Sequence, residues 1–200
     1  MLGGLARIAA PTAAVAALVL VGCSGAVQEP TGGAGASSGA AAAFNDTDVV
    51  FAQGMVPHHE QAVEMAEIVL AIEGVDPRVV EVAEEIRAAQ APEIEQLDAM
   101  LEAWGQDRGR VDGHGEHGAH GGTGEGMMSP ADLEALERAE GAEASRLFLE
   151  QMIEHHEGAV MMAQVEVDGG ESAAAVRLAE AIVREQRAEI DAMRALLDRL

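Results

Sequence analysis

The sequence predicts an all-α protein: a four-helix bundle built from two repeated helical hairpins, with a short extra helix before the third long helix. From about residue 44 onward, apolar residues recur at spacings of three and four, and strand patterns are nearly absent. One twelve-residue segment also occurs twice, at residues 55–66 and again at residues 152–163. Two hairpins with matching apolar faces bury those faces best against each other, so the repeat favours a bundle.

The first half contains start and stop signals for two helices. Asn45 can cap a helix that continues to about residue 72, where Gly74 can end it. Asp76 and Pro77 form the N-cap and first position of a second helix, which should run to about residue 104. We expect a bend within that helix at Pro92, because proline removes a backbone hydrogen bond.

The second half repeats this plan after one extra element. Ser129 and Pro130 open a short helix, which Gly141 should interrupt. A long helix is expected from about residue 142 to residue 167, and Ser172 can cap a last helix that reaches the C-terminus. The join between the hairpins, residues 105–128, is long, glycine-rich and polar. It permits either an alternating up-down order or a crossover, and the sequence leaves both open.

The first residues are typical of an export signal. Arg7 is followed by a mostly apolar run that is too short for a typical spanning helix, and residues 20–23 resemble a bacterial lipobox ending in Cys23. Lipid on Cys23 would anchor the protein to the extracytoplasmic face of the cell membrane, and a plain secretory signal with an incidental cysteine is the alternative. The expected organisation is a signal peptide (1–22), a flexible tether (23–43) and a bundle domain (44–200) with repeat halves (44–104 and 142–200) and a histidine-containing linker (105–128).

The charge balance restricts the partners. The formal charge is −23, and every fixed positive side chain is arginine because the chain has no lysine. Such acidity argues against nucleic acid as a partner and is compatible with the collection of cations. Cys23 is the single cysteine, so the chain has neither a disulfide framework nor a paired-cysteine metal site.

Histidine and methionine recur together in the repeat. Four of the seven histidines form two adjacent pairs, each with methionines three residues before and seven residues after the first histidine. Imidazole and thioether groups are ligands of soft or borderline metals such as copper. The candidate metal ligands are His58, His59, His155, His156, Met55, Met65, Met152 and Met162.

Helical geometry places these side chains on one face of each helix. At about 100° per residue, Met55 and Met65 lie within about 60° of His58, whereas His59 lies at the shoulder of that face. The same angles recur around His155. Both pairs also fall near the middle of their helices, so the two faces can meet in one central site whichever way the chain crosses.

The second helix of each half carries polar residues on its apolar stripe. Buried polar groups need partners, and a metal-bound histidine usually donates its other N–H to a carboxylate or a carbonyl. We therefore expect these residues to support the histidines, with direct metal ligation by the glutamates left open. They are Gln90 and Glu93 in the first half and Gln186 and Glu189 in the second.

The linker contains a second candidate for metal binding. His114, His117 and His120 are spaced by three in a glycine-rich, acidic segment, which resembles a metal-collecting tract. Met127 and Met128 nearby can add soft ligands. The alternative is a solvated linker without a metal role.

Other chemistries fit less well. A di-iron carboxylate site in a bundle needs a glutamate three residues before its histidine, and here those positions hold Met55, Val56, Met152 and Ile153. No nucleophile pairing is apparent, so we expect a binding protein, with a metal-dependent envelope oxidase as the enzymatic alternative. A structural or interaction bundle without metal is the other alternative, since methionine at helical spacing is usually core.

At these motifs the chain resembles the bacterial domain-of-unknown-function 305 family, whose members are exported, ferritin-like helical bundles. The resemblance rests on the Met-x2-His-His-x2-Ala-x2-Met-Ala pattern from Met55 and from Met152, and on the Ile-x3-Gln-x2-Glu-Ile elements from Ile86 and Ile182. It covers roughly residues 44–200. Some members are similar to copper-binding envelope proteins that support metal tolerance, so the resemblance implies copper here.

We therefore expect an envelope lipoprotein that binds copper, as Cu(I) or Cu(II), and that scavenges, buffers or delivers it. Zinc or another divalent metal is the alternative cargo. A copper donor or acceptor protein is a candidate partner, and the sequence leaves the oligomeric state open.

Overall fold

A computed structural model describes residues 43–109 and 126–200 of the chain. Its helices are α1 (Asp46–Ala71), α2 (Pro77–Trp104), α3 (Pro130–Arg138), α4 (Gly141–Gly169) and α5 (Ala173–Leu197). These described ranges contain no strand. The all-α prediction is confirmed, including the short α3 before the third long helix.

Local sequence signals account for where the helices begin and end. Asn45 caps α1 in a capping box with Asp48, and Ser129 caps α3 in the same way. Asp76 accepts a backbone hydrogen bond at the start of α2, as Ser172 does for α5. Between α3 and α4 the chain turns at Gly141, whose φ of +50° lies in the left-handed region that favours glycine.

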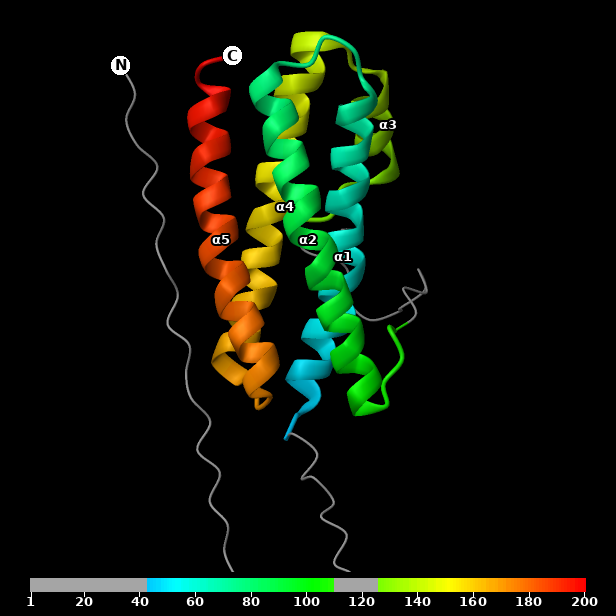
Figure 1. Ribbon diagram of the computed structural model, residues 1–200, viewed down its shortest axis with the longest axis vertical. Coiled ribbons are helices and arrows are strands. Elements are labelled where there is room, and N and C mark those ends of the chain that lie inside the picture. Colours follow the sequence, from blue (N-terminus) through cyan, green and yellow to red (C-terminus); the bar gives the residue numbers. More distant parts are fainter. Residues whose placement is uncertain (1–42, 110–125) are drawn as a thin grey trace, which may run out of the picture. The chain divides into compact units, whose positions relative to one another are not determined.

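The long helices pair in an order that requires a crossover. The Asn45 side chain donates to the Gly169 carbonyl at 2.8 Å, so α1 starts where α4 ends. Gln53 of α1 donates to the Asp107 carbonyl at 2.7 Å, which places the end of α2 at the same end of the bundle. The chain must therefore travel the length of the bundle between α2 and α4 (Figure 1). This settles the topology that the sequence left open.

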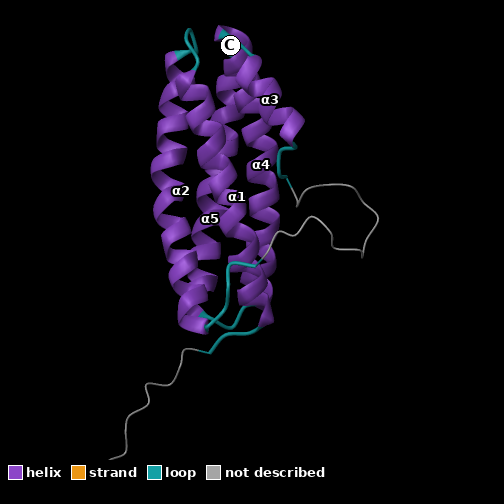
Figure 2. Ribbon diagram, turned by 90° about the vertical axis from the view of Figure 1, so that its right-hand side faces the viewer, coloured by secondary structure: helices purple, strands orange, loops and turns teal. Residues whose placement is uncertain are grey.

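The internal repeat also appears in the contacts that join the helices. The Asp76 N–H donates to Ser145 Oγ at 2.9 Å, and the equivalent Ser172 N–H donates to Asp48 Oδ1 at 2.9 Å. Each half thus anchors the start of its second helix to the first helix of the other half. Helix α3 packs across α1 and α4 near the start of α4 (Figure 2).

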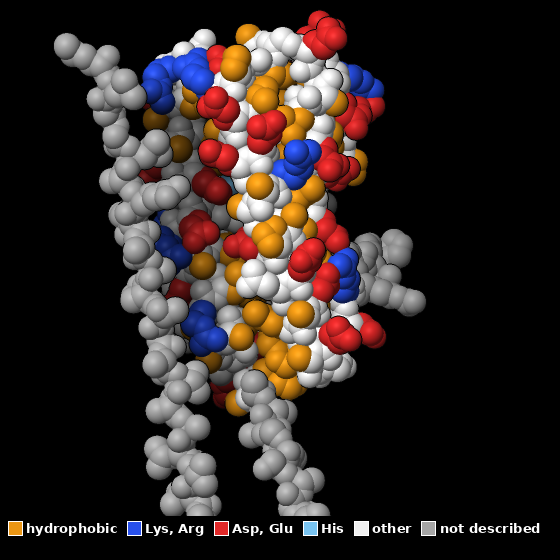
Figure 3. Space-filling model, in the orientation of Figure 1, with side chains coloured by type: hydrophobic (Ala, Val, Ile, Leu, Met, Phe, Trp, Pro, Cys, Tyr) orange, Lys and Arg blue, Asp and Glu red, His pale blue; other side chains and the backbone are white. Residues whose placement is uncertain are grey.

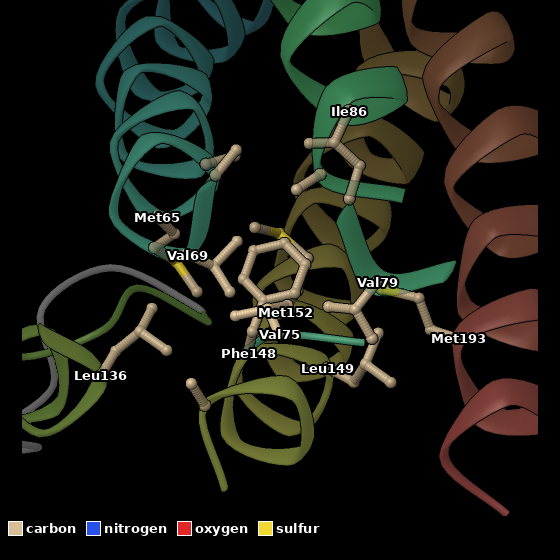
Figure 4. Packing of buried hydrophobic residues seen from close by; sticks show 14 of the residues in the cluster. Met65, Val69, Val75, Val79, Ile86, Leu136, Phe148, Leu149, Met152 and Met193 are labelled. Carbon is tan, nitrogen blue, oxygen red and sulfur yellow. The ribbon is translucent and has the colours of Figure 1, made fainter. Parts of the chain in front are cut away.

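The core consists of two apolar clusters rather than one. We call them the upper and lower clusters, after their places in Figure 1. The upper cluster surrounds Phe148 and includes Met65 and Met152 (Figure 4). The lower cluster includes Phe51 and Met55. None of the described helices is long and apolar enough to cross a membrane.

Candidate metal centre

A layer of polar side chains separates the two apolar clusters. On α1, for example, the lower cluster ends at Val56 and the upper cluster begins at Ala62. Helices α1 and α4 each contribute a histidine pair at this height, whereas α2 and α5 each contribute a glutamine and a glutamate. We call the eight residues the histidine layer: His58, His59, Gln90, Glu93, His155, His156, Gln186 and Glu189.

The first histidine of each pair meets its counterpart at the centre of the layer. The ring centroids of His58 and His155 are 3.8 Å apart, with the rings tilted by 43°. The His155 and His156 ring centroids are 6.3 Å apart. All four histidines are buried. The helix faces that the sequence places at mid-length therefore do converge.

The second histidine of each pair binds a glutamate of its own hairpin. His59 Nε2 lies 2.8 Å from Glu93 Oε2, and His156 Nε2 lies 2.8 Å from Glu189 Oε2. Because a carboxylate only accepts, the proton of the neutral ring belongs on Nε2, and Nδ1 is then the nitrogen that has the lone pair. Within the described residues, Nδ1 has no hydrogen-bond partner in either ring. A carboxylate that fixes the histidine tautomer in this way is the usual arrangement behind a metal-bound imidazole.

His155 packs against the rings of both His58 and His156. Neither of its ring nitrogens has a hydrogen-bond partner among the described residues. Burial lowers the pKa of His155 well below its ordinary value, and the neighbouring His58, His156 and His59 lower it further. His155 is therefore neutral, the form in which imidazole can bind a metal.

The four methionines lie at two distances from the histidines. Met55 and Met152 each precede a histidine by three residues, about 4.5 Å along the helix axis. Met65 and Met162 follow by seven residues, about 10.5 Å along the axis. Because α1 and α4 run in opposite directions, Met55 and Met152 flank the layer from opposite sides, and both are buried. They are the thioethers nearest to the central rings along the helix axes.

The side chains in their present positions do not enclose a metal. Across residues 43–109 and 126–200, no three His, Cys, Asp or Glu side chains converge closely enough to hold an ion. The donors nearest the centre of the layer are imidazole nitrogens, and the thioether sulfurs of Met55 and Met152 flank them. Binding therefore requires ring rotation, a thioether ligand or both.

Sequence reasoning missed one element that covers the layer. Gln61 holds the Met128 backbone at both polar atoms: its Nε2 donates to the carbonyl at 2.9 Å, and its Oε1 accepts from the N–H at 2.7 Å. The neighbouring Gly126 lies so close to α4 that a Cβ would approach Glu154 O to 2.8 Å and Gly158 Cα to 2.9 Å. We call residues 126–128 the strap. One feature of the sequence could have indicated the strap: Gln61 and Gly158 occupy equivalent positions of the repeat but differ in residue type.

The remaining predicted sites lie elsewhere. Cys23, His114, His117 and His120 fall outside the described residues. Met128 is buried in the upper cluster.

The repeated helical bundle and its buried histidine layer place the chain among all-α bundle proteins with imidazole groups at the centre. The family described as "Domain of unknown function (DUF305)" matches residues 48–197, and the chain belongs to this family. The resemblance noted in the sequence is confirmed. No curated protein sequence matches the chain.

Solved structures of similar proteins share the fold. A DUF305 fragment from Deinococcus radiodurans is 34% identical with a TM-score of 0.69, covering 78% of this chain and 98% of that one. A putative secreted DUF305 protein from Streptomyces coelicolor is 30% identical with a TM-score of 0.68, covering 76% and 91%. CopM in its Cu(II)-bound form is 32% identical with a TM-score of 0.61, covering 76% and 96%. CopM has also been solved in a Cu(I)-bound form, at 29% identity and a TM-score of 0.63, covering 78% and 98%.

Proposed function

We propose that this protein binds copper in the histidine layer and scavenges, buffers or delivers it in the cell envelope. The observation that carries the proposal is the duplicated arrangement in which a glutamate fixes His59 or His156 from outside while His58 and His155 meet at the centre. Lipid on Cys23 would hold the protein at the extracytoplasmic face of the membrane. The proposed role is binding rather than catalysis.

The residues present suit copper in either oxidation state. Neutral imidazoles bind both Cu(I) and Cu(II), and thioether groups favour Cu(I). Glu93 and Glu189 would hold the single proton of the neutral His59 and His156 rings on Nε2, which leaves Nδ1 as the nitrogen that binds the metal. Met55 and Met152 would supply the sulfur ligands, because they lie one turn from the central rings. Met65 and Met162 would serve a site only further along the bundle axis.

The comparison with CopM supports copper as the metal. CopM has been solved in Cu(I)-bound, Cu(II)-bound and Ag-bound forms. Silver(I) and copper(I) are soft ions that prefer thioether and imidazole ligands. A related bundle that binds both ions favours copper over zinc as the cargo of this chain.

Copper titration of the purified protein tests the proposal. We expect the double variant His58→Ala with His155→Ala to lose the highest-affinity copper, because it removes the central ring pair. The matched control replaces His114, His117 and His120 with alanine and should retain that copper. If the control loses the copper and the central double variant does not, the linker is the binder and the histidine layer is not.

A structural role without metal is the second candidate. Its supporting observation is that the buried His59–Glu93 and His156–Glu189 contacts are also what a purely structural hydrogen-bonded layer would use. In that case, the wild-type protein would bind copper no more tightly than the double variant, and copper would leave its unfolding midpoint unchanged.

A further inference from the structure

The histidine layer is covered on one side of the bundle. At the boundary between α1 and α4, the strap lies against the backbone of Glu154 and Gly158 and is held by Gln61. These positions lie within one turn of the histidines on their own helices. The strap therefore lies across the α1–α4 boundary at the height of the histidine layer.

The opposite side of the layer contains a pocket. Helices α2 and α5 pack against each other much more loosely than α1 packs against α4. Between them lies a small pocket with room for little more than one water molecule or ion. Its lining includes Ala89 and all four polar residues that α2 and α5 contribute to the layer. The space-filling view shows acidic side chains along this boundary (Figure 3).

Two buried amides line this pocket, and each has at least one polar atom without a hydrogen-bond partner in the described residues. Gln90 is 2% exposed, and neither its Nε2 nor its Oε1 has a hydrogen-bond partner in the described residues. Gln186, its equivalent in the repeat, is 4% exposed, and its Oε1 is likewise unpartnered there. An unsatisfied buried amide is costly, so these groups require a guest with complementary polarity. Two carbonyl oxygens at one small pocket suit a cation or its bound water.

The two carboxylates connect the pocket to the histidines. Glu93 and Glu189 line the pocket, and their side chains are 14% and 32% exposed. Each also contacts a buried histidine through Oε2, at 2.8 Å. The nearby Glu185 is paired with Arg184, so Glu93 and Glu189 supply the pocket's unneutralised negative charge. A cation in the pocket would be one side chain away from an imidazole.

We propose that the pocket between α2 and α5 is the access site through which a partly hydrated metal cation reaches the histidine layer. The amide oxygens of Gln90 and Gln186 and the carboxylates of Glu93 and Glu189 hold the cation before it passes to the imidazole nitrogens. This inference rests on the proposed copper function. It adds a transient cation site and the side of the bundle from which the ion enters.

A bulky side chain at the opening of the pocket tests this access route. Ala89 is exposed and lines the pocket, whereas the neighbouring Ala88 is exposed and does not. We expect Ala89→Phe to slow copper association and dissociation by at least about tenfold with little change in affinity, because the ion must wait for the helices to part. Ala88→Phe, on the same helix, should keep wild-type rates. Stopped-flow mixing with copper and then with a chelator measures both rates.

A second variant tests the holding groups. Gln90→Leu with Gln186→Leu removes the unsatisfied amides while keeping side-chain size, so the bundle should fold. We expect slower copper association than in Gln96→Leu, an exposed glutamine replacement on α2, and equal association rates in the two proteins would show that the amides do not hold the entering ion. Equal rates in Ala89→Phe and Ala88→Phe would overturn the access route, even if copper still binds. If wild-type protein binds no copper at all, the proposed function fails first and the route fails with it.

Discussion

At the scale of single residues, the two histidines of each pair make different contacts: the first meets its counterpart on the other helix, and the second contacts a glutamate. The angular argument places His58 and His155 on the facing sides of their helices and their neighbours at the shoulder, and the structure shows this division. The sequence also identifies the residues that approach the shoulder histidines, because Glu93 and Glu189 interrupt an apolar stripe at equivalent positions. It does not reveal which histidine each glutamate contacts. That choice depends on how closely the two helices of a hairpin pack.

The glutamates should matter for copper affinity. Glu93→Gln replaces a carboxylate acceptor of His59 with a neutral amide, so the ring is held less firmly in its metal-binding tautomer. We expect copper affinity to fall by about 10- to 100-fold, the usual effect of losing a partner behind a metal ligand. Competition with a calibrated chelator measures it. Glu95→Gln, at an exposed position two residues away, is the control, and equal affinities in the two variants would contradict a supporting role for Glu93.

The buried carboxyl group of Glu166 affects the stability of the fold. Burial and the neighbouring Asp48 raise the pKa of Glu166 from 4.5 to about 8. The Asp48 carboxyl is the neighbouring group that favours the protonated form of Glu166. Between pH 4.5, the pKa of an unfolded glutamate, and about pH 8, the pKa in the fold, the native state thus binds more protons than the unfolded state. The contribution of Glu166 to stability is therefore fully present below the unfolded pKa and is lost as pH rises through about 8.

Glu166→Gln tests this carboxyl pair. Wild-type protein should lose stability of the order of 3 kcal/mol between about pH 5 and about pH 9, whereas the neutral amide should remove most of that loss. Urea denaturation at the two pH values measures the difference. Equal pH dependence in both proteins would show that Glu166 does not titrate in this range.

At the scale of the elements, helix boundaries follow local chemistry. Asn45, Asp76, Ser129 and Ser172 cap the helices at the positions where the sequence places them. The strap has no comparable local signal. It depends on contacts between residues distant in the chain, such as Gln61 with Met128, and on a close approach that only glycine permits at Gly126.

Alanine substitutions at two glycines with similar positive φ can distinguish the cost of backbone strain from the cost of a steric collision. Gly126 and Gly105 have φ of +80° and +67°, but a Cβ at Gly105 would meet nothing within 4 Å. Gly105→Ala should cost about 1 kcal/mol through backbone strain alone. Gly126→Ala should cost about 2–3 kcal/mol, because a methyl group would collide with the backbone of α4. Urea denaturation of both variants measures these costs, and equal losses would mean that the strap does not lie tightly on α4.

At the scale of the whole molecule, the repeat builds a bundle whose two halves share one central layer. The sequence predicts the four-helix architecture and the height of that layer, because the histidine pairs fall at mid-length in both halves. It cannot predict the crossover, since residues 105–128 are long enough for either connection. The strap lies across the α1–α4 boundary, and the pocket proposed for access lies between α2 and α5. The strong negative charge of the chain would draw cations toward it.

The most direct test of the central claim is to locate copper in a crystal of the copper-loaded protein by anomalous scattering at the copper absorption edge. We predict a strong peak within the histidine layer, between His58 and His155, with imidazole nitrogens as ligands. Peaks confined to other parts of the molecule, with the histidine layer unchanged, would contradict the account.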